Sequence, residues 1–378
     1  MNIAIVVTWG SNFGKRGSYN RQETGMARAL AELGHEVVVL KAVRDGEPIL
    51  VEKLAENCVL KDIKTRMLGN NGIFEAEYVR ELEAFKPDAL VMFADLQLCT
   101  PAVARWCRRN SVLFIPYVGS IVSKRRWRLA LQTFSRSRNF RVFRSWPVLA
   151  KTDAIKRDLT SVGVMDVHVV SVGLDTADMP SPTVASRPDA RRELGLGPGP
   201  IVGFVGRITP DKYPQSLPRI LAELRSHRAW RIIIVGEGSL SSSLNQHFEQ
   251  LGLRDQVLWI HSIPNREMWK IYLASDVLVN TNHGEVFGMC LLESLYFGTP
   301  VVAVSAPGPQ MILRHGTDGF LSDSSPAMVA EYVEKAYDCR MEMGMFGQER
   351  ISGALSWKVG AHMILEVIKE QRRRPGSG

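Results

Sequence analysis

Two cations follow a β-branched run in the second half of the chain. The run IVGFVGR occupies residues 201–207, and the segment GRITPDK places Arg207 and Lys212 in the loop after it. Arginine offers a planar fork that matches phosphate oxygens, whereas lysine offers a compact charge. Together they can hold a diphosphate and offset negative charge that grows on a departing phosphate group. A solvated loop with two exposed bases is the alternative.

Two carboxylates follow a second run, DVLVNT at residues 276–281. Glu285 and Glu293 lie at the two ends of EVFGMCLLE, in which Gly288 opens a predicted helix. This spacing puts Glu285 in the loop and Glu293 inside the helix, so they cannot form one acid/base dyad but can hold different parts of an extended ligand. The free N–H groups at the helix start, from Phe287 to Cys290, favour an anion. Helix capping and solvation is the alternative.

The elements that must position these residues alternate between short β-branched runs and longer helical patterns, which is typical of βα units around a parallel sheet. The expected strands are 2–7, 35–41, 88–94, 112–117, 147–150, 201–207, 231–237, 256–262, 276–281 and 300–305. The expected helices include 20–33, 74–85, 100–109, 122–136, 152–162 and 356–371. An open parallel sheet binds ligands at the carboxyl ends of its strands. This rule adds Gly236 and Ile263, at the ends of the second and third runs of the second half, to the candidate ligand-binding residues.

The length of 378 residues suits two domains. A Pro-, Gly- and Ser-rich stretch without a strand pattern separates two series of βα units, so we expect a linker there. The predicted division is a first domain at 1–178, a linker at 179–200, a second domain at 201–350, and a C-terminal helix with a basic tail at 351–378.

Composition excludes several classes of protein. The first apolar run is far too short to span a membrane and lacks the basic lead of a signal peptide, so we expect a cytoplasmic chain. The five cysteines include no C-x-x-C pair, which argues against a disulfide framework and a zinc site. The chain also has no D-x-D motif, and we expect neither a metal nor a cofactor.

Basic residues concentrate in the first half of a chain whose net charge is +8. No acidic residue occurs between Asp95 and Asp153, and residues 123–144 form a basic stretch with apolar residues at helical spacing. Such a helix suits an anionic membrane surface, a candidate partner at the inner face of the membrane, or a phosphate-bearing ligand. A solvated basic helix face is the alternative. Nucleic acid is disfavoured because the arginines form no recognised nucleic-acid motif.

The second half resembles the retaining family 4 glycosyltransferases, also called glycosyl transferases group 1. The segments GRITPDK, GEG, EVFGMCLLES, FGTPVVA and GTDGFL occur in the family's order, continuously from about 201 to 322. The resemblance implies a GT-B fold: two Rossmann-like α/β domains with parallel sheets facing across a cleft, and a C-terminal helix that returns to the first domain. It also implies a nucleotide-diphosphate sugar as donor and a glycan, lipid-linked molecule or small molecule as acceptor.

The resemblance also assigns roles to residues. Glu285 would contact the donor sugar, Glu293 the ribose, and Arg207 and Lys212 the diphosphate. The further donor-binding positions are Phe287, Gly288, Met289, Gly236 and Ile263. The implied mechanism is retention by front-face attack, in which the leaving phosphate oxygen takes the proton of the acceptor and no metal is needed.

The first half resembles the family's acceptor domain more weakly, through ALAELGHEV, VGLD at 172–175 and Trp357. Gly17 falls where the family has a Gly-Gly loop and is a candidate contact to the diphosphate. Residues 36–167 contain no histidine, although family members often carry one near the reaction centre. Asp95 and Tyr117 stand at the corresponding strand ends as candidates for the acceptor side. A second departure is Gln310, where the family usually has a glutamate.

We therefore expect a retaining hexosyltransferase that uses a UDP- or GDP-sugar. The alternatives are a nucleotide-sugar-binding protein without turnover, and a DNA-modifying or epimerase-type enzyme of the same fold.

Overall fold

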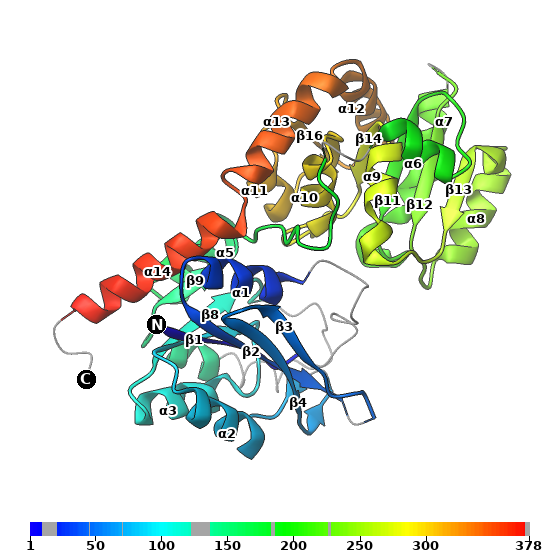
Figure 1. Ribbon diagram of the computed structural model, residues 1–378. Coiled ribbons are helices and arrows are strands. Elements are labelled where there is room, and N and C mark those ends of the chain that lie inside the picture. The colour runs from blue at the N-terminus through cyan, green and yellow to red at the C-terminus, as the bar shows by residue number, and fades with distance from the viewer. Residues whose placement is uncertain are drawn as a thin grey trace. The chain divides into compact units, whose positions relative to one another are not determined.

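The computed structural model describes residues 1–9, 21–44, 46–69, 71–121, 137–182, 186–225 and 228–374. The chain divides into two compact units: unit 1 comprises Met1–Asp175 and Ser356–Gly378, and unit 2 comprises Thr176–Leu355 (Figure 1). The expected helix at 122–136 and Gly17 lie outside the described residues.

Unit 1 is built on an eight-stranded sheet in the order β10-β9-β8-β7-β1-β2-β4-β3. All neighbouring strands are parallel except β3 and β4. The strands are β1 (Asn2–Val7), β2 (Glu36–Val43), β3 (Val51–Ala55), β4 (Cys58–Lys64), β7 (Ala89–Phe93), β8 (Leu113–Val118), β9 (Val148–Ala150) and β10 (Val167–Val169). A two-stranded hairpin, β5 (Met67–Leu68) and β6 (Asn71–Gly72), stands beside it. The predicted strands of the first half all occur, whereas β3, β4 and β10 were not predicted.

Helices cover both faces of the unit 1 sheet. They are α1 (Gln22–Glu32), α2 (Ala76–Phe85), α3 (Thr100–Arg109), α5 (Asp153–Ser161) and α14 (Trp357–Arg373), with a further helix at 137–143. Figure 1 shows α2 and α3 across the sheet from α1 and α14, which pack against each other. One apolar core joins the buried residues of α2, α3 and α5 to those of the strands.

The C-terminal helix α14 belongs to unit 1, which confirms the expected return of this helix to the first domain. Trp357 at its start is 3% exposed. A Cβ atom on Gly25 would lie 2.3 Å from the Trp357 ring, and one on Gly173 would lie 2.2 Å from the Trp357 backbone nitrogen. Glycine at both positions therefore lets α1 and the segment after β10 approach Trp357 closely.

Unit 2 is built on a six-stranded, fully parallel sheet in the order β13-β12-β11-β14-β15-β16. Its strands are β11 (Ile201–Val205), β12 (Arg231–Val235), β13 (Val257–Ile260), β14 (Val277–Asn280), β15 (Val301–Val304) and β16 (Gly319–Ser322). The first five were predicted and β16 was not. The helices are α6 (Arg187–Glu193), α7 (Leu217–Arg225), α8 (Ser241–Gln250), α9 (Trp269–Ala274), α10 (Met289–Tyr296), α11 (Pro307–Ile312), α12 (Pro326–Asp338) and α13 (Arg340–Ser352).

The expected linker at 179–200 contains a helix, α6, that is part of unit 2. Ser186 caps this helix by accepting a hydrogen bond from the backbone N–H of Asp189. Arg187 and Arg191 each bind a carboxylate oxygen of Asp276 at 2.7 Å, which ties α6 to the start of β14. A helix this short leaves little periodic signal among prolines and glycines, so composition alone indicated a linker.

Candidate functional site

The loops after β11 and β14 meet at the point where the strand order of unit 2 reverses. From β11 the chain continues to β12 and β13 on one side, and it returns to β14 on the other side of β11. Ligands of open parallel sheets bind at such a point, outside the carboxyl ends of the strands. The structure brings Lys212 of the first loop and Glu285 of the second loop together here.

Lys212 and Glu285 form an ion pair, with Nζ 2.7 Å from Oε2. Asn282 donates a second hydrogen bond to Oε2 of Glu285 at 2.9 Å, and the Thr281 hydroxyl holds the Lys212 carbonyl at 2.8 Å. Burial alone would raise the pKa of Glu285, but the charge of Lys212 and these hydrogen bonds hold it below its ordinary value. Glu285 is therefore a carboxylate at neutral pH.

Arg207 points to a different partner in the same loop. Its guanidinium binds Asp211 at 2.9 Å, and its side chain is 59% exposed. Thr209 donates a hydrogen bond to the other oxygen of Asp211 at 2.7 Å. Arg207 therefore lies in the same loop as Lys212 but pairs with Asp211, not with Glu285 or Glu293.

Glu293 lies in the second turn of α10 and is 5% exposed. Its carboxyl group accepts a hydrogen bond from the hydroxyl of Tyr272, a fully buried residue of α9. Burial raises the pKa of Glu293 to about 7, and the hydrogen bond from Tyr272 offsets only part of this rise. The two glutamates thus differ in charge near neutral pH.

Two glycines shape the loops of this site. Gly236, after β12, has φ +133°, and a Cβ atom there would lie 2.0 Å from the carbonyl oxygen of Gly206. Gly288, which caps the start of α10, has φ +97°, and a Cβ atom there would lie 3.2 Å from Cγ of Glu285. Both positions therefore require glycine for conformation and for space.

The remaining predicted donor-side residues of unit 2 differ in exposure. Phe287 is 5% exposed, so its side chain belongs to the interior. Met289, at the first position of α10, and Ile263, in the loop after β13, are partly buried. Gly308 donates its backbone N–H to the Glu285 carbonyl at 2.9 Å. Gln310, two residues later, instead binds the Ser305 hydroxyl at 2.9 Å.

The two acceptor-side candidates of unit 1 have structural partners. Asp95 accepts hydrogen bonds from the backbone N–H groups of Gly119 and Ser120, and so holds the loop after β8. Tyr117 is fully buried, and its hydroxyl donates to the Val170 carbonyl at 3.1 Å. Tyr117 therefore belongs to the interior of unit 1, whereas Asp95 is partly buried and accepts both hydrogen bonds through one oxygen, Oδ1.

Sequence reasoning missed two buried polar residues, Tyr272 of α9 and Lys151 after β9. Tyr272 gives no motif signal, because an aromatic residue in a short helix usually indicates a core position. Lys151 follows β9 and is 8% exposed. Its Nζ lies 3.0 Å from Oε1 of Gln22 and faces the Phe93 and Tyr117 rings at 5.4 and 5.2 Å. The signal available for Lys151 was its position directly after a predicted strand.

Within the described residues, no group of three or more His, Cys, Asp and Glu side chains is arranged to hold a metal ion. No helix in this part of the chain is long and apolar enough to cross a membrane. Of the basic stretch 123–144, residues 123–136 lie outside the described part, while Arg138, Arg141 and Arg144 are described and exposed.

Comparisons with known proteins concern the sequence of unit 2 and the fold. The sequence profile of the family described as "Glycosyl transferases group 1" matches residues 186–350, which contain Arg207, Lys212, Glu285 and Glu293. D-inositol 3-phosphate glycosyltransferase from Nocardia farcinica is 34% identical over 234 residues, which cover 58% of this chain and 51% of that protein. This chain thus spans about half the length of the curated relatives it matches.

Solved structures of glycosyltransferases share the whole fold. Sucrose-phosphate synthase from Thermosynechococcus elongatus superposes with a TM-score of 0.78 at 17% identity, over 98% of this chain and 99% of that chain. Anabaena HepE in complex with UDP and glucose gives a TM-score of 0.71 at 17% identity, over 98% and 100% of the two chains. At these identities the likeness concerns the fold alone, and it confirms the predicted GT-B class with two Rossmann-like domains. Residues 186–350, which make up most of unit 2, thus resemble the glycosyl transferases group 1 family.

Proposed function

We propose that this chain transfers a sugar from a nucleotide-diphosphate sugar, bound by unit 2, to a hydroxyl group of an acceptor. The observation that supports the proposal best is the 2.7 Å pair of Lys212 and Glu285 at the strand-order reversal of the unit 2 sheet. It joins a phosphate-binding cation to a sugar-binding carboxylate at the place where this type of sheet binds ligands.

The proposed role of Lys212 is to stabilise the departing diphosphate. An ammonium group has three donors, and Glu285 takes one of them, which leaves donors for phosphate oxygens. The exposed fork of Arg207 supplies a second cation in the same loop. These two cations also support the proposal that the diphosphate is neutralised without a metal. Glu285 stays ionised and can accept hydrogen bonds from the hydroxyl groups of the donor sugar.

We further propose a hexose from a UDP- or GDP-sugar as the transferred group, with retention at the anomeric carbon. The names of the curated relatives point to D-inositol 3-phosphate as an acceptor of those proteins. A phosphorylated polyol is therefore the first acceptor to test here, before glycans and lipid-linked molecules.

The test is an incubation of the full chain with a panel of UDP- and GDP-sugars, with and without D-inositol 3-phosphate. Free nucleoside diphosphate is quantified, and NMR of the product identifies the anomer. We expect release that depends on both the donor and an acceptor. Lys212→Ala lowers turnover, whereas Glu293→Ala weakens donor binding. Lys335→Ala is the matched control, because it removes a lysine from an exposed pair with Glu331 on α12.

Other outcomes of this assay contradict the proposal. If the donor binds but no diphosphate is released with a phosphorylated polyol, a glycan or a lipid-linked acceptor, the chain is a nucleotide-sugar-binding protein. Isomerisation or hydrolysis that ignores every acceptor indicates an epimerase-type enzyme. Equal kinetics for Lys212→Ala, Glu293→Ala and Lys335→Ala contradict the site assignment.

Contact of residues 123–144 with an anionic membrane surface is a separate part of the proposal. Its support is the absence of acidic residues from this stretch and the exposure of Arg138, Arg141 and Arg144. Flotation with vesicles of phosphatidylglycerol and phosphatidylcholine tests it. No flotation at low salt, where exposed charges attract most strongly, contradicts it.

A further inference from the structure

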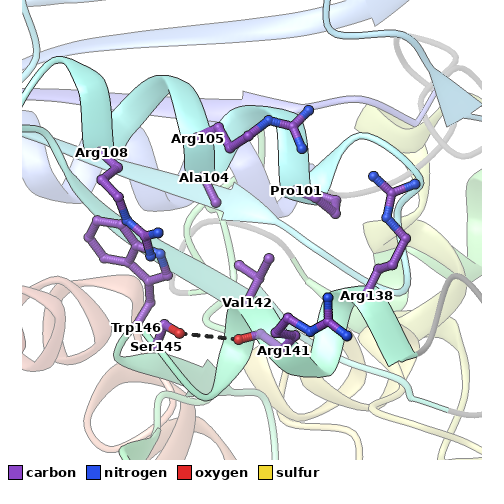
Figure 2. Close-up of a pocket in the computed structure, with 9 residues that line it drawn as sticks. All are labelled: Pro101, Ala104, Arg105, Arg108, Arg138, Arg141, Val142, Ser145 and Trp146. Carbon is purple, nitrogen blue, oxygen red and sulfur yellow. Dashed lines mark hydrogen bonds between the residues drawn. The ribbon is translucent and has the colours of Figure 1, made fainter.

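A pocket on unit 1 is lined by four arginines, of which Arg138 and Arg141 belong to the basic stretch 123–144 and Arg105 and Arg108 have no assigned role. It lies between α3 and the helix at 137–143 and measures about 380 Å³. The residues that line it are Pro101, Ala104, Arg105, Arg108, Arg138, Arg141, Val142, Ser145 and Trp146. Figure 2 shows these side chains converging from two helical segments, with Val142 between them.

Helical spacing explains why these residues share one pocket. On α3, Pro101, Ala104, Arg105 and Arg108 lie three or four positions apart, and so do Arg138, Arg141, Val142 and Ser145 on the second segment. Residues at these spacings occupy one face of a helix. Two such faces oppose each other here, and each contributes two guanidinium groups.

The pocket has an apolar base and a basic rim. Ala104 is 5% exposed, and Val142 and Trp146 pack against the apolar core of unit 1. The Trp146 ring contacts Phe114 edge to face, with centroids 5.9 Å apart. Cζ of Arg108 lies 5.8 Å from the centroid of the Trp146 ring, which positions this arginine at one end of the pocket.

Among the described residues, no carboxylate lines the pocket to balance its cations. Arg105, Arg108 and Arg141 form no ion pair with any described residue. Arginine does not lose its charge at any physiological pH, so these three groups can each take an oxygen of a bound anion. The buried indole N–H of Trp146 also has no acceptor among the described residues.

We propose that this pocket binds a phosphomonoester. Guanidinium groups bind phosphate oxygens in pairs, and a monoester presents three terminal oxygens to several of them at once. The Trp146 ring and Val142 give the organic part of such a molecule an apolar surface. A pocket of this size admits a small phosphorylated molecule or the headgroup of a lipid. The inference stands on unit 1 alone and does not rest on the proposed sugar transfer.

Calorimetric titration of the full chain with glucose 6-phosphate tests the binding, with glucose as the uncharged reference. Arg105→Gln/Arg108→Gln removes two guanidinium groups from one wall of the pocket. We expect it to weaken binding at least about ten-fold, which corresponds to about 1.4 kcal/mol. Arg109→Gln is the matched control, because Arg109 is exposed on the same helix but does not line the pocket.

A second variant excludes binding to the phosphate site of unit 2. Arg207→Ala/Lys212→Ala removes the cations of that site, and we expect it to bind glucose 6-phosphate as the wild type does. If this variant loses binding while Arg105→Gln/Arg108→Gln keeps it, the proposal is wrong. Equal weakening by Arg105→Gln/Arg108→Gln and by Arg109→Gln also overturns it, since general charge attraction then explains the binding.

Vesicles identify the source of the phosphomonoester. Phosphatidate has a phosphomonoester headgroup, whereas phosphatidylglycerol has a phosphodiester. Vesicles of the two lipids are matched in surface charge, so a difference in binding reports recognition of the phosphomonoester and not general attraction to an anionic membrane. Preference for phosphatidate that is lost in Arg105→Gln/Arg108→Gln supports a lipid headgroup. Binding of glucose 6-phosphate without that preference supports a soluble ligand. Binding of neither probe overturns the proposal.

Discussion

The charges of Lys212 and Glu285 stabilise each other in a partly buried ion pair. Their side chains are 23% and 12% exposed, so each charge is partly removed from water. Removal of one partner from such a pair leaves the other without compensation, which costs more than removal of both. This coupling can be measured separately from activity.

We expect Lys212→Ala to lower the free energy of unfolding by about 2 kcal/mol, because Glu285 then stays buried without its cation. Lys212→Ala/Glu285→Gln should recover at least half of this loss. Urea denaturation of unit 2, followed by hydrogen exchange, measures both values. If Lys212→Ala/Glu285→Gln has no higher free energy of unfolding than Lys212→Ala, the two residues do not form a coupled pair in solution.

The buried carboxyl of Glu293 predicts a pH dependence of stability. Its pKa is raised from 4.5 to about 7 in the folded chain, so the folded state binds the proton more tightly than the unfolded state. The stabilisation is complete below pH 4.5 and is lost as the pH rises to about 7. The rise in pKa corresponds to about 3 kcal/mol.

Glu293→Gln removes this titration and leaves an oxygen to accept from Tyr272. We therefore expect the unfolding free energy of unit 2 to fall between pH 4.5 and 7 by about 3 kcal/mol more in the wild type than in Glu293→Gln. Hydrogen exchange of unit 2 across this pH range provides the measurement. Parallel pH profiles for the two proteins would show that Glu293 is ionised in the folded chain.

At the scale of elements, the close approach of two loops depends on Gly236. A Cβ atom at this position meets the Gly206 carbonyl at 2.0 Å, so Gly236→Ala must displace the loop that carries Arg207. Gly252 also has a positive φ, +64°, but nothing lies within 4 Å of its Cβ position. An alanine at either position has a strained backbone, but only at Gly236 does its Cβ atom also collide with a neighbour. Comparison of the two variants therefore separates the cost of strain from the cost of the collision.

We expect Gly252→Ala to cost about 1 kcal/mol, because an alanine with positive φ is strained. Gly236→Ala should cost at least twice as much and also weaken the binding of UDP or GDP, since the Arg207 loop moves. Thermal unfolding with and without nucleotide measures both effects. Equal losses in the two variants, with unchanged nucleotide binding, would contradict this role of Gly236.

The same elements explain how far the sequence predicts the structure. Strands β11, β12, β14 and β15 are almost fully buried runs rich in valine and isoleucine, and this pattern is strong enough to locate the loops that hold Arg207, Lys212 and Glu285. Strand β3 is a partly exposed edge strand that contains Glu52 and Lys53, and the buried residues of β4 are interrupted by Lys61, so both strands were missed. The contact of Tyr272 with Glu293 joins two helices through the core, and no local pattern encodes such a contact.

At the scale of the whole molecule, the last helix of the chain stabilises the unit in which the chain begins. Trp357 packs between Gly25 and Gly173 and contacts the Tyr117 ring edge to face, with centroids 6.5 Å apart. Asp175, beside this contact, binds Arg28 of α1 at 2.7 Å. The packing of unit 1 therefore depends on contacts between the first helix and the last helix of the chain.

Trp357→Ala should for this reason destabilise unit 1 by about 3 to 5 kcal/mol and leave unit 2 unchanged, because it removes a large side chain from a packed interior. Hydrogen exchange resolves the two units: we expect β1, β2 and α1 to lose protection, and β11 to β15 to keep it. Met363→Ala is the matched control, since Met363 is 41% exposed on the same helix and should change exchange very little. Equal loss of protection in both units would mean that they unfold as one body, and that α14 contributes to both.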